Sequence, residues 1–370
     1  MQKRVLVFSE SFGLGHERAA NALIMGINTI SDNFNILHTN SIRNSFPILT
    51  NAFLKLYMQI INNVPRVWHR FYESGRNNTN SLGTKNVVYN LLGRSIKKII
   101  RDYKPHVIVC THPFPAAVVS RFKEQGLDVP LVGIVTDYDI HGYWLNNQID
   151  LYIVGDRKLN NFELFSSQSL AVSPSGIPID PAFGKKLDKK QAKRSLALDR
   201  ERPVVLVAGG GWGLGNLGKI SELIARIPEN PQIVVIAGTN YKLHRILKET
   251  LAGLPNVIVK GFVNNMHDYM LAADVMVTKP GGLTTSEGLA AGLPMVLFDV
   301  IYGQEVWNAK FLTESGAAKR IGGIGEIPEI VRAVITDHQE SKRLSQNALV
   351  IGKPEAGIVA AEKIVNLAVG

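Results

Sequence analysis

The segment Lys279–Glu287 has the composition of a phosphate-binding turn. It follows the apolar run Val275–Thr278, which predicts a buried strand, and it leads into residues that predict a helix. Gly281 and Gly282 would let a ligand approach the backbone, and the N–H groups at a helix start favour an anion. Glu287, about one turn further on, could accept hydrogen bonds from the two vicinal hydroxyls of a ribose. The alternative is a tight strand-to-helix turn with a solvated glutamate.

Two further glycine clusters repeat this pattern of strand, glycine turn and helix. One includes Gly15 and follows the apolar run Val5–Phe8, and the other includes Gly210 and Gly211 and follows Val204–Ala208. Ligands of parallel α/β sheets bind at the carboxyl ends of the strands. We therefore expect nucleotide-type loops in both halves of the chain.

The alternation of apolar runs with helical segments predicts two doubly wound α/β domains with mostly parallel sheets. Proline and glycine crowd into residues 173–181, which marks the boundary. The expected parts are an N-terminal domain (1–180), a C-terminal domain (190–350) and a last helix (351–370) that could pack back on the first domain. In the first half we expect strands at 5–8, 35–38, 107–111, 131–136 and 151–154, helices at 18–29, 86–101 and 116–125, and a mobile loop at 74–84.

The cysteine content and the lack of long apolar segments indicate the cellular compartment. The single cysteine, Cys110, lies in an apolar run and cannot form an intramolecular disulfide, which suits a reducing cytoplasm. We find neither a signal-peptide pattern nor an apolar stretch of transmembrane length. The sequence thus predicts a cytoplasmic protein whose contact with a membrane, if it has one, is peripheral.

Positive charge concentrates in the first half. The net charge is +10, and between residues 43 and 101 Glu73 is the only acid among ten basic residues that alternate with aliphatic and aromatic ones. Such a stretch could bind nucleic acid or an anionic membrane, or could be an ordinary helix with a charged outer face. In this stretch, long aliphatic side chains outnumber the flat aromatic ones that could stack on bases. We therefore expect a membrane face and no nucleic-acid partner. Its candidate residues are Arg66, Trp68, Arg70, Phe71, Lys97 and Lys98.

Six short motifs follow one another along the chain. They are Gly13-x-Gly15-His16, Val135-Thr136-Asp137 with His141 and Trp144, Gly209-Gly210-Gly211, Gly261-Phe262-Val263, Thr278–Gly282 and Gly303-Gln304-Glu305-x-x-Asn308. Taken together they resemble family 28 glycosyltransferases, and within them the monogalactosyldiacylglycerol synthases and processive diacylglycerol glucosyltransferases. The resemblance implies a two-domain GT-B fold, a UDP-glucose or UDP-galactose donor held by the second domain, and a diacylglycerol acceptor approached by the first. It also implies a peripheral position on the inner face of the cell membrane.

The resemblance also implies roles for single residues. Glu287 would hold the donor ribose, and His16 would lie against the acceptor. Two places differ from the pattern of the family, Trp212 and the run 298–300, and either could change which sugar fits. The remaining donor-binding residues are Gly281, Gly282 and Thr284 for the diphosphate, Gln304, Glu305 and Asn308 for the sugar hydroxyls, and Phe262 and Val263 for the uracil edge.

Sugar transfer with inversion needs a base for the acceptor hydroxyl and a group that stabilises the departing diphosphate. His16 is the expected base because imidazole titrates near neutral pH, and Asp137 is either a rival base or the group that orients His16. Lys279 and the helix start could stabilise UDP without a metal, so no cofactor is expected and the UDP-sugar is a co-substrate. The alternative is that Asp137 and Asp139 form an Asp-x-Asp site for manganese.

Three other functions share these motifs. The acceptor could be another lipid, such as an undecaprenyl-linked sugar. The chain could also be a UDP-sugar epimerase of the same fold, or a non-catalytic protein that senses UDP-sugars.

Overall fold

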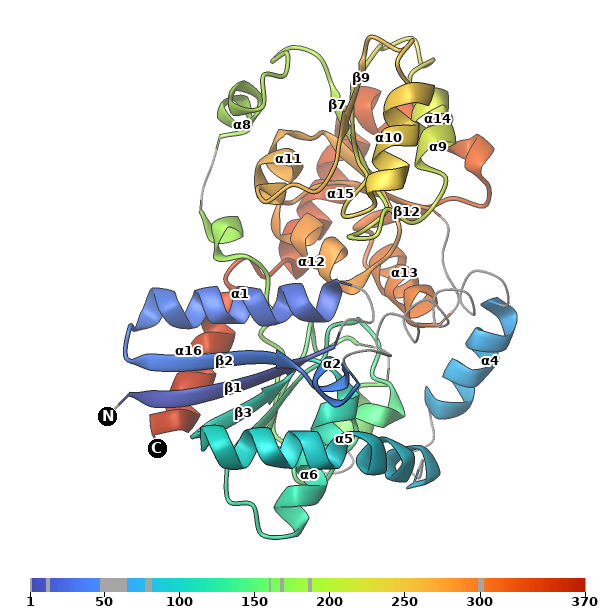
Figure 1. Cartoon of the computed structure of the whole chain (residues 1–370). Helices are drawn as coiled ribbons and strands as arrows, with labels where there is room; N and C mark the ends of the chain where they lie inside the picture. The colour runs from blue at the N-terminus through green and yellow to red at the C-terminus, as the bar shows by residue number, and fades with distance from the viewer. Residues whose placement is uncertain are drawn as a thin grey trace. The chain divides into compact units, whose positions relative to one another are not determined.

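The computed structural model describes residues 2–10, 14–46, 65–76, 82–159, 161–166, 170–185, 188–298 and 303–369. The chain divides into two compact units, each with its own six-stranded sheet (Figure 1). The first unit comprises Met1–Pro181, Ile301–Trp307 and Glu355–Gly370, and the second comprises Ala182–Val300 and Asn308–Pro354. The first long segment ends at Pro181, and the boundary expected from the sequence lies at residues 173–181.

The first unit is built on the strand order β2-β1-β3-β4-β5-β6, and every neighbouring pair is parallel. The strands are β1 (Lys3–Ser9), β2 (Phe34–Asn40), β3 (Val107–Cys110), β4 (Leu131–Ile134), β5 (Leu151–Ile153) and β6 (Val172–Ser173). The helices are α1 (Gly15–Ile30), α2 (Ser41–Ser45), α4 (Pro65–Arg76), α5 (Leu82–Tyr103), α6 (Pro113–Glu124), α7 (Glu163–Ser166) and α16 (Ala356–Val369), with a 3-10 turn η1 (Gly142–Trp144).

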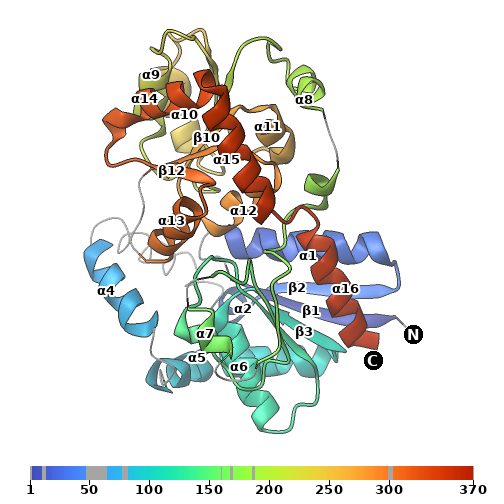
Figure 2. The ribbon, with the colours of Figure 1, turned by 180° about the vertical axis from the view of Figure 1, so that it is seen from behind.

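Helices cover both faces of this sheet. Side chains of α1 and α16 share one core with residues of β1, β3 and β4 that alternate along the strands, while α5 and α6 pack together on the other face (Figures 1 and 2). The contact of α1 with α16 is close because Gly26 lies there. A Cβ at position 26 would lie 2.4 Å from the carbonyl oxygen of Gly357, so a larger residue would force the helices apart.

One expectation for this unit was wrong in part. The predicted mobile loop at 74–84 is helical at both ends, since α4 continues to Arg76 and α5 begins at Leu82. Residues 77–81 lie outside the described residues. The asparagine and glycine content of the stretch suggested a loop, but apolar side chains of α5 pack on the sheet and override that local preference.

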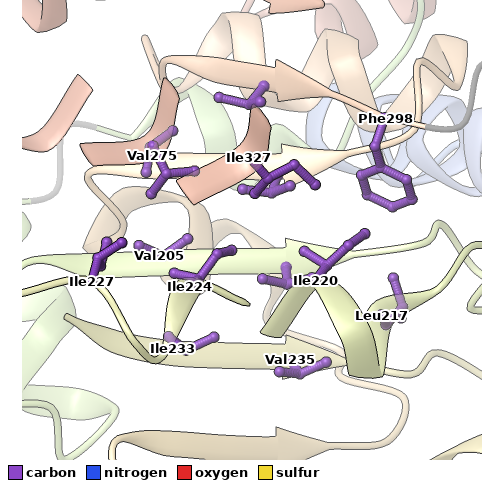
Figure 3. Packing of buried hydrophobic residues seen from close by; sticks show 14 of the residues in the cluster. Val205, Leu217, Ile220, Ile224, Ile227, Ile233, Val235, Val275, Phe298 and Ile327 are labelled. Atoms are coloured by element: carbon purple, nitrogen blue, oxygen red, sulfur yellow. The ribbon is translucent and has the colours of Figure 1, made fainter. Parts of the chain in front are cut away.

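The second unit has the strand order β12-β11-β10-β7-β8-β9, again parallel throughout. Its core consists of aliphatic side chains from strands and covering helices, and Figure 3 shows how Val205, Ile220 and Ile224 interleave there. The strands are β7 (Val204–Ala208), β8 (Gln232–Ile236), β9 (Val257–Lys260), β10 (Val275–Thr278), β11 (Met295–Leu297) and β12 (Ala318–Arg320). The helices are α8 (Lys189–Ser195), α9 (Leu217–Ile224), α10 (Tyr241–Thr250), α11 (Met266–Ala272), α12 (Gly282–Ala290), α14 (Ile327–Thr336) and α15 (His338–Ile351), together with most of α13 (Gln304–Glu314); the 3-10 turns are η2 (Pro181–Gly184) and η3 (Ile324–Glu326).

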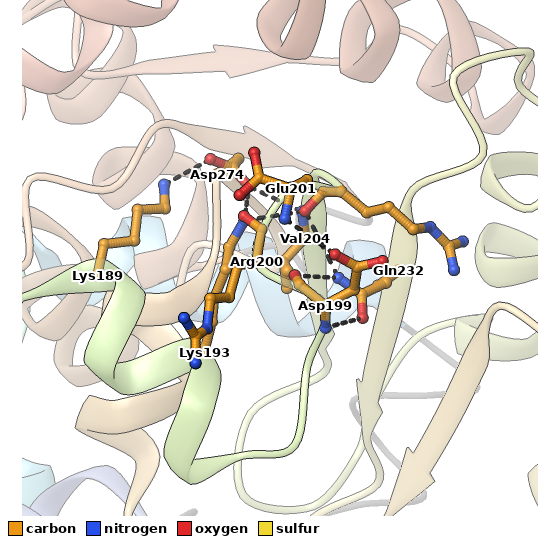
Figure 4. A network of polar contacts seen from close by, with 9 residues as sticks. Lys189, Lys193, Asp199, Arg200, Glu201, Val204, Gln232 and Asp274 are labelled. Atoms are coloured by element: carbon orange, nitrogen blue, oxygen red, sulfur yellow. Dashed lines mark hydrogen bonds and ion pairs between the residues drawn. The ribbon is translucent and has the colours of Figure 1, made fainter.

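A polar network fixes the central strands of this second sheet at their amino ends. Asp274, just before β10, accepts a hydrogen bond from the backbone N of Val204 at 2.8 Å and pairs with Lys189 of α8 at 2.5 Å (Figure 4). The network sets β7 beside β10, and Ala208 then lies opposite Thr278 at the carboxyl ends of the two strands. The loops that follow these two strands are therefore neighbours.

Among the described residues, we find no helix that is both long and apolar enough to cross a membrane.

Candidate functional site

Each sheet reverses its strand order at one place. In the second unit the reversal falls between β7 and β10, and in the first unit it falls between β1 and β3. Loops diverge at the carboxyl ends of such a strand pair and leave room for a ligand. The predicted glycine loops and His16 all follow strands of these two pairs.

The switch point of the second unit brings Lys279 onto the glycine loop that follows β7. The Lys279 side chain lies against Gly210, where an added Cβ would be 3.0 Å from its Cε, and its Nζ lies 3.6 Å from the corresponding position at Gly281. The Lys279 ammonium group therefore lies close to both glycine turns. This is the arrangement expected for a diphosphate, which needs exposed backbone N–H groups and a positive charge.

The glycine loop itself is fixed by backbone hydrogen bonds. Leu214 N donates to Gly209 O and Gly213 N donates to Gly210 O, while Thr239 N donates to Gly211 O. Gly210 has a φ of 71°, a left-handed conformation that strains other residues. Gly210 and Gly211 are thus held in one conformation with their backbone available at the carboxyl edge of the sheet.

Helix α12 presents its first turn at the same edge. Its N-cap, Gly281, has no side chain to cap the helix, and the hydroxyl groups of Thr285 and Ser286 donate to carbonyl oxygens of Gly281 and Gly282. Glu287 is only 1 % exposed, so the alternative of a solvated glutamate is wrong. Thr284 is half-buried on the same helix.

Asn308 of α13 holds the Lys279–Gly282 turn in place through a side-chain hydrogen bond. Its side chain is fully buried, and its Nδ2 donates to the carbonyl oxygen of Pro280 at 3.0 Å. The predicted role in reading sugar hydroxyls stays a prediction, to which the structure adds a role in positioning the turn. In the same motif Gln304 is half-buried and Glu305 is buried.

The loop after β9 contains the residues predicted to meet uracil. Phe262 is 52 % exposed, unusual for a phenylalanine, and Val263 beside it is half-buried.

Trp212, which departs from the family pattern, is half-buried in the glycine loop, and its carbonyl oxygen accepts from Asn240 Nδ2 at 3.4 Å. Of the other departure, Phe298 is buried, and residues 299 and 300 lie outside the described residues.

The switch point of the first unit holds His16, in the first turn of α1. Its Nδ1 lies 2.7 Å from the carbonyl oxygen of Thr111 and 3.0 Å from Oγ1 of Thr136. A carbonyl oxygen can only accept, so Nδ1 carries the proton and Nε2 is the basic nitrogen. Burial lowers the pKa of His16 to about 4, which keeps the imidazole neutral at physiological pH.

Two neighbours of His16 were not given a role by the sequence. Thr111 ends up beside it because β3 pairs with β1, and its hydroxyl also donates to the His16 carbonyl at 3.0 Å. His112 lies edge-on to His16 with ring centroids 4.7 Å apart, and it caps α6 by accepting from Phe114 N. The Thr111 carbonyl is a backbone atom, so no side-chain motif could have revealed it. Gly15 precedes His16, and nothing lies within 4 Å of a Cβ placed there.

Asp137 and Asp139 lie in different environments. Asp139 is buried and accepts hydrogen bonds from the guanidinium of Arg76 at 2.7–3.0 Å, so its carboxylate is engaged in an ion pair. Asp137 is half-buried, next to the threonine that contacts His16. The manganese alternative would require Asp139 to leave Arg76. Among the described residues, no group of three His, Cys, Asp or Glu side chains could hold a metal ion.

The predicted membrane residues lie on α4 and α5. Arg70, Lys97 and Lys98 are exposed, whereas the side chains of Arg66, Trp68 and Phe71 lie outside the described ones. On α5 five of the exposed positions form one stripe, because residues spaced by three and four share a helix face. We call it the α5 stripe: Val87 (58 % exposed), Leu91 (52 %), Arg94, Lys98 and Arg101. Only Lys98 of this stripe was singled out from the sequence.

Comparison with known proteins supports the resemblance of both halves. The profile of monogalactosyldiacylglycerol (MGDG) synthase matches residues 16–179, and that of glycosyl transferases group 1 matches residues 188–349. A processive diacylglycerol beta-glucosyltransferase of Staphylococcus carnosus is 29 % identical over 93 % of this chain and 88 % of its own. The enzyme of the same name from Staphylococcus aureus (strain MRSA252) is 29 % identical over 88 % of this chain and 82 % of its own.

Solved structures confirm the expected fold. MurG of Acinetobacter baumannii superimposes with a TM-score of 0.65 over 98 % of this chain and 99 % of its own, at 14 % identity. The calicheamicin glycosyltransferase CalG4 gives 0.63 over 99 % and 98 %, at 16 % identity. Two Rossmann-like units give the chain the GT-B fold. The match to glycosyl transferases group 1 and the names of the relatives identify it as a glycosyltransferase. The first half of the chain is similar to the monogalactosyldiacylglycerol (MGDG) synthases, and most of the chain is similar to the processive diacylglycerol beta-glucosyltransferases.

Proposed function

We propose that this enzyme transfers a hexose from a UDP-sugar to the free hydroxyl of 1,2-diacylglycerol, with inversion at the anomeric carbon. The observation that carries the proposal is the tautomer of His16, whose Nδ1 donates to Thr111 O and whose Nε2 is therefore basic. A neutral imidazole can take the proton of the acceptor hydroxyl as the oxygen attacks. The names of the curated relatives support diacylglycerol as the acceptor and favour glucose over galactose as the sugar.

The second unit would hold the donor through the groups at its switch point. Lys279 and the first turn of α12 would stabilise the diphosphate as it leaves, which makes a metal unnecessary. Glu287 would bind the ribose, and the loop at Phe262 and Val263 would bind the uracil. In addition to this unit, Gln304 and Glu305 at the start of α13 would bind the sugar hydroxyls. The Thr111 carbonyl already sets the orientation of the His16 ring, so Asp137 is not needed for that role. Asp137 would instead assist His16 during catalysis.

The lipid acceptor requires contact with a membrane, and the α5 stripe supplies a suitable surface. It combines exposed aliphatic side chains, Val87 and Leu91, with three exposed cations. Such a surface inserts apolar groups between lipids while its charges attract anionic headgroups. We propose that the enzyme binds peripherally to the anionic inner face of the cell membrane.

A transfer assay tests the proposal. Purified enzyme is mixed with labelled UDP-glucose or UDP-galactose and with phosphatidylglycerol vesicles that contain diacylglycerol, and the lipids are separated by thin-layer chromatography. We expect label in a glycolipid that depends on diacylglycerol and persists in excess chelator. Label only in an undecaprenyl-linked product, conversion of the UDP-sugar without a lipid product, or binding of UDP-sugar without turnover would each contradict it in favour of one of the other functions.

A further inference from the structure

Arg76, the last residue of α4, is almost fully enclosed. It is 6 % exposed, and its guanidinium donates from Nε and Nη2 to the carboxylate of Asp139 while its Cζ lies 3.5 Å above the centroid of the Trp307 ring. Arginine stays charged in proteins, so burying it requires that the charge be paired. Here the fork of the guanidinium binds a carboxylate at its edge and an aromatic ring on its face, two contacts that lysine cannot reproduce together.

The rest of the last turn of α4 is attached to the same two partners. The indole Nε1 of Trp307 donates to Glu73 at 2.8 Å, and Tyr72 OH donates to Asp139 at 3.3 Å. His141 Nε2 in turn donates to the Tyr72 carbonyl oxygen at 3.0 Å. We call this group the Arg76 cluster; its members are Tyr72, Glu73, Arg76, Asp139, His141 and Trp307, all in the first unit.

Backbone packing makes the contact specific. Gly75 lies between members of the cluster, and a Cβ there would be 2.9 Å from Cε1 of His141 and 3.1 Å from the hydroxyl oxygen of Tyr143. Only glycine allows α4 to approach η1 so closely. The last turn of α4 is therefore fitted to this surface through main chain as well as side chains.

The two partners of Arg76 belong to segments that carry the chemistry. Asp139 lies three residues after Thr136, whose hydroxyl contacts Nδ1 of His16. Trp307 lies on the first turns of α13, three residues after Gln304. The middle of α4 holds the exposed Arg70, and the helix belongs to the basic, aromatic stretch of the sequence. One short helix thus connects an exposed arginine of the basic, aromatic stretch with the loop beside His16 and with the segment that bears the sugar motif.

We propose that Arg76 is a positioning residue that couples binding of α4 to an anionic lipid surface with the arrangement of the Thr136–His141 loop and the first turns of α13. This inference rests on the proposed function. The physical basis is that a helix of 12 residues is marginal on its own in water, so it depends on contacts at its ends and faces. The Arg76 cluster and the lipid surface stabilise the same folded helix, and two such interactions must strengthen each other.

The test uses the full-length enzyme, UDP-glucose and a water-soluble diacylglycerol with short acyl chains, with or without phosphatidylglycerol vesicles that lack diacylglycerol. For the wild type we expect vesicles to raise the transfer rate at least about fivefold, the lower range of allosteric couplings. In Arg76→Lys, which keeps the charge but not the fork, this ratio should fall below about two. Independently of the rate, the vesicle concentration that sediments half of the protein should rise by about fivefold, the lower range for coupled binding equilibria.

Arg332→Lys is the matched control, because Arg332 is an exposed arginine that pairs with Glu229 at 2.8 Å in the second unit. It should behave as wild type in both measurements. Trp307→Phe keeps a ring under the guanidinium but removes the N–H that Glu73 accepts, and it should lose part of the stimulation. If Arg76→Lys fails to fold by circular dichroism, Trp307→Phe and Glu73→Gln decide the matter in its place.

The inference would be overturned if the folded Arg76 and Trp307 variants kept the wild-type stimulation of transfer by vesicles and the wild-type vesicle affinity. It would also be overturned if vesicles did not change the transfer rate of the wild type. A wild type that transfers no sugar would refute the proposed function instead. The sedimentation measurement needs no catalysis, and an unchanged vesicle affinity of Arg76→Lys would then still overturn the coupling.

Discussion

At the scale of single residues, His16 is defined by atoms that its own sequence motif does not contain. The glycine and histidine spacing predicted a helix-start histidine with a catalytic role, and the structure places it at the carboxyl edge of the first sheet. Its tautomer comes from the Thr111 carbonyl and its low pKa from burial. Neither could be predicted from the sequence, because a backbone acceptor on another strand and the loss of water are both products of folding.

We predict that His16→Ala lowers turnover by about 10²–10⁴-fold, the usual contribution of a positioned base, while UDP binds with nearly unchanged affinity. Because the pKa of His16 is lowered to about 4, the neutral form prevails above that value. The loss of wild-type kcat/KM on acidification that is due to His16 should therefore fall near pH 4 and not near 6.5. Steady-state kinetics across pH, with calorimetry of UDP binding, measure both effects. Activity within a few-fold of wild type would transfer the role of base to Asp137.

Glu287→Ala should weaken the binding of UDP itself. A buried carboxylate that accepts hydrogen bonds from ribose hydroxyls contributes about 1.5–3 kcal/mol, or roughly a 10- to 150-fold change in affinity. Calorimetry with UDP and with uridine 5′-diphosphate lacking the 2′-hydroxyl separates the ribose contact from a general loss of structure. If Glu287→Ala binds both nucleotides as tightly as wild type, Glu287 has no part in the donor site.

Glu10 illustrates a buried acid outside the proposed chemistry. It follows β1, is fully buried, and accepts hydrogen bonds from the backbone N of Ser41 and Ile42 as well as from the Ser41 hydroxyl. Burial raises the pKa of Glu10 to about 7, so the folded state holds this proton more tightly than the unfolded state does. Stability from this group is present below about pH 4.5 and is lost as pH rises through 7.

We predict that Glu10→Gln reduces the loss of stability between pH 5 and 8. The largest difference expected between the two proteins is about 3 kcal/mol, from 1.36 kcal/mol for each unit of pKa. Urea unfolding at several pH values measures it. Parallel pH profiles for wild type and Glu10→Gln would show that the carboxyl group is not protonated in the folded protein.

At the scale of elements, long apolar strands could be predicted from the sequence, and short or polar ones could not. The predicted central strands of both sheets are present because runs such as Val204–Ala208 are buried on both faces. The edge strand β12 consists of Ala318, Lys319 and Arg320, and only its pairing with β11 makes it a strand. The burial of Arg76 was equally invisible, since arginine on an amphipathic helix normally faces water.

The α5 stripe leads to a prediction with a matched control. Replacing Arg94, Lys98 and Arg101 by Ser should weaken binding to phosphatidylglycerol vesicles by up to about a hundredfold, at about 1 kcal/mol for each cation near the surface. UDP affinity should not change. Replacing the three exposed cations of α10 (Lys242, Arg245 and Lys248) removes the same charge from the second unit and should have little effect. Equal losses in the two triple variants would show that net charge, and not the α5 stripe, drives binding.

At the scale of the whole molecule, the two units repeat one design with different contents. Each has six parallel strands and a topological switch point, and the second carries glycine turns and a lysine where the first carries His16 with Thr111 and Thr136. Chemistry suited to a nucleotide thus lies on one unit and chemistry suited to a hydroxyl on the other. The placement of the glycine turns and of His16 at the carboxyl ends of strands could be predicted, because each motif directly follows a strong strand signal in the sequence.

The stereochemistry of the first product tests the central claim most directly. Wild-type enzyme is given UDP-glucose, in which the sugar is α-linked, with diacylglycerol in phosphatidylglycerol vesicles, and the glycolipid is analysed by proton NMR. An oxygen activated by His16 and attacking opposite the departing UDP must yield the β-anomer, so the account predicts β-glucosyl diacylglycerol and almost none from His16→Ala. An α-linked product, or undiminished β-product from His16→Ala, would contradict it.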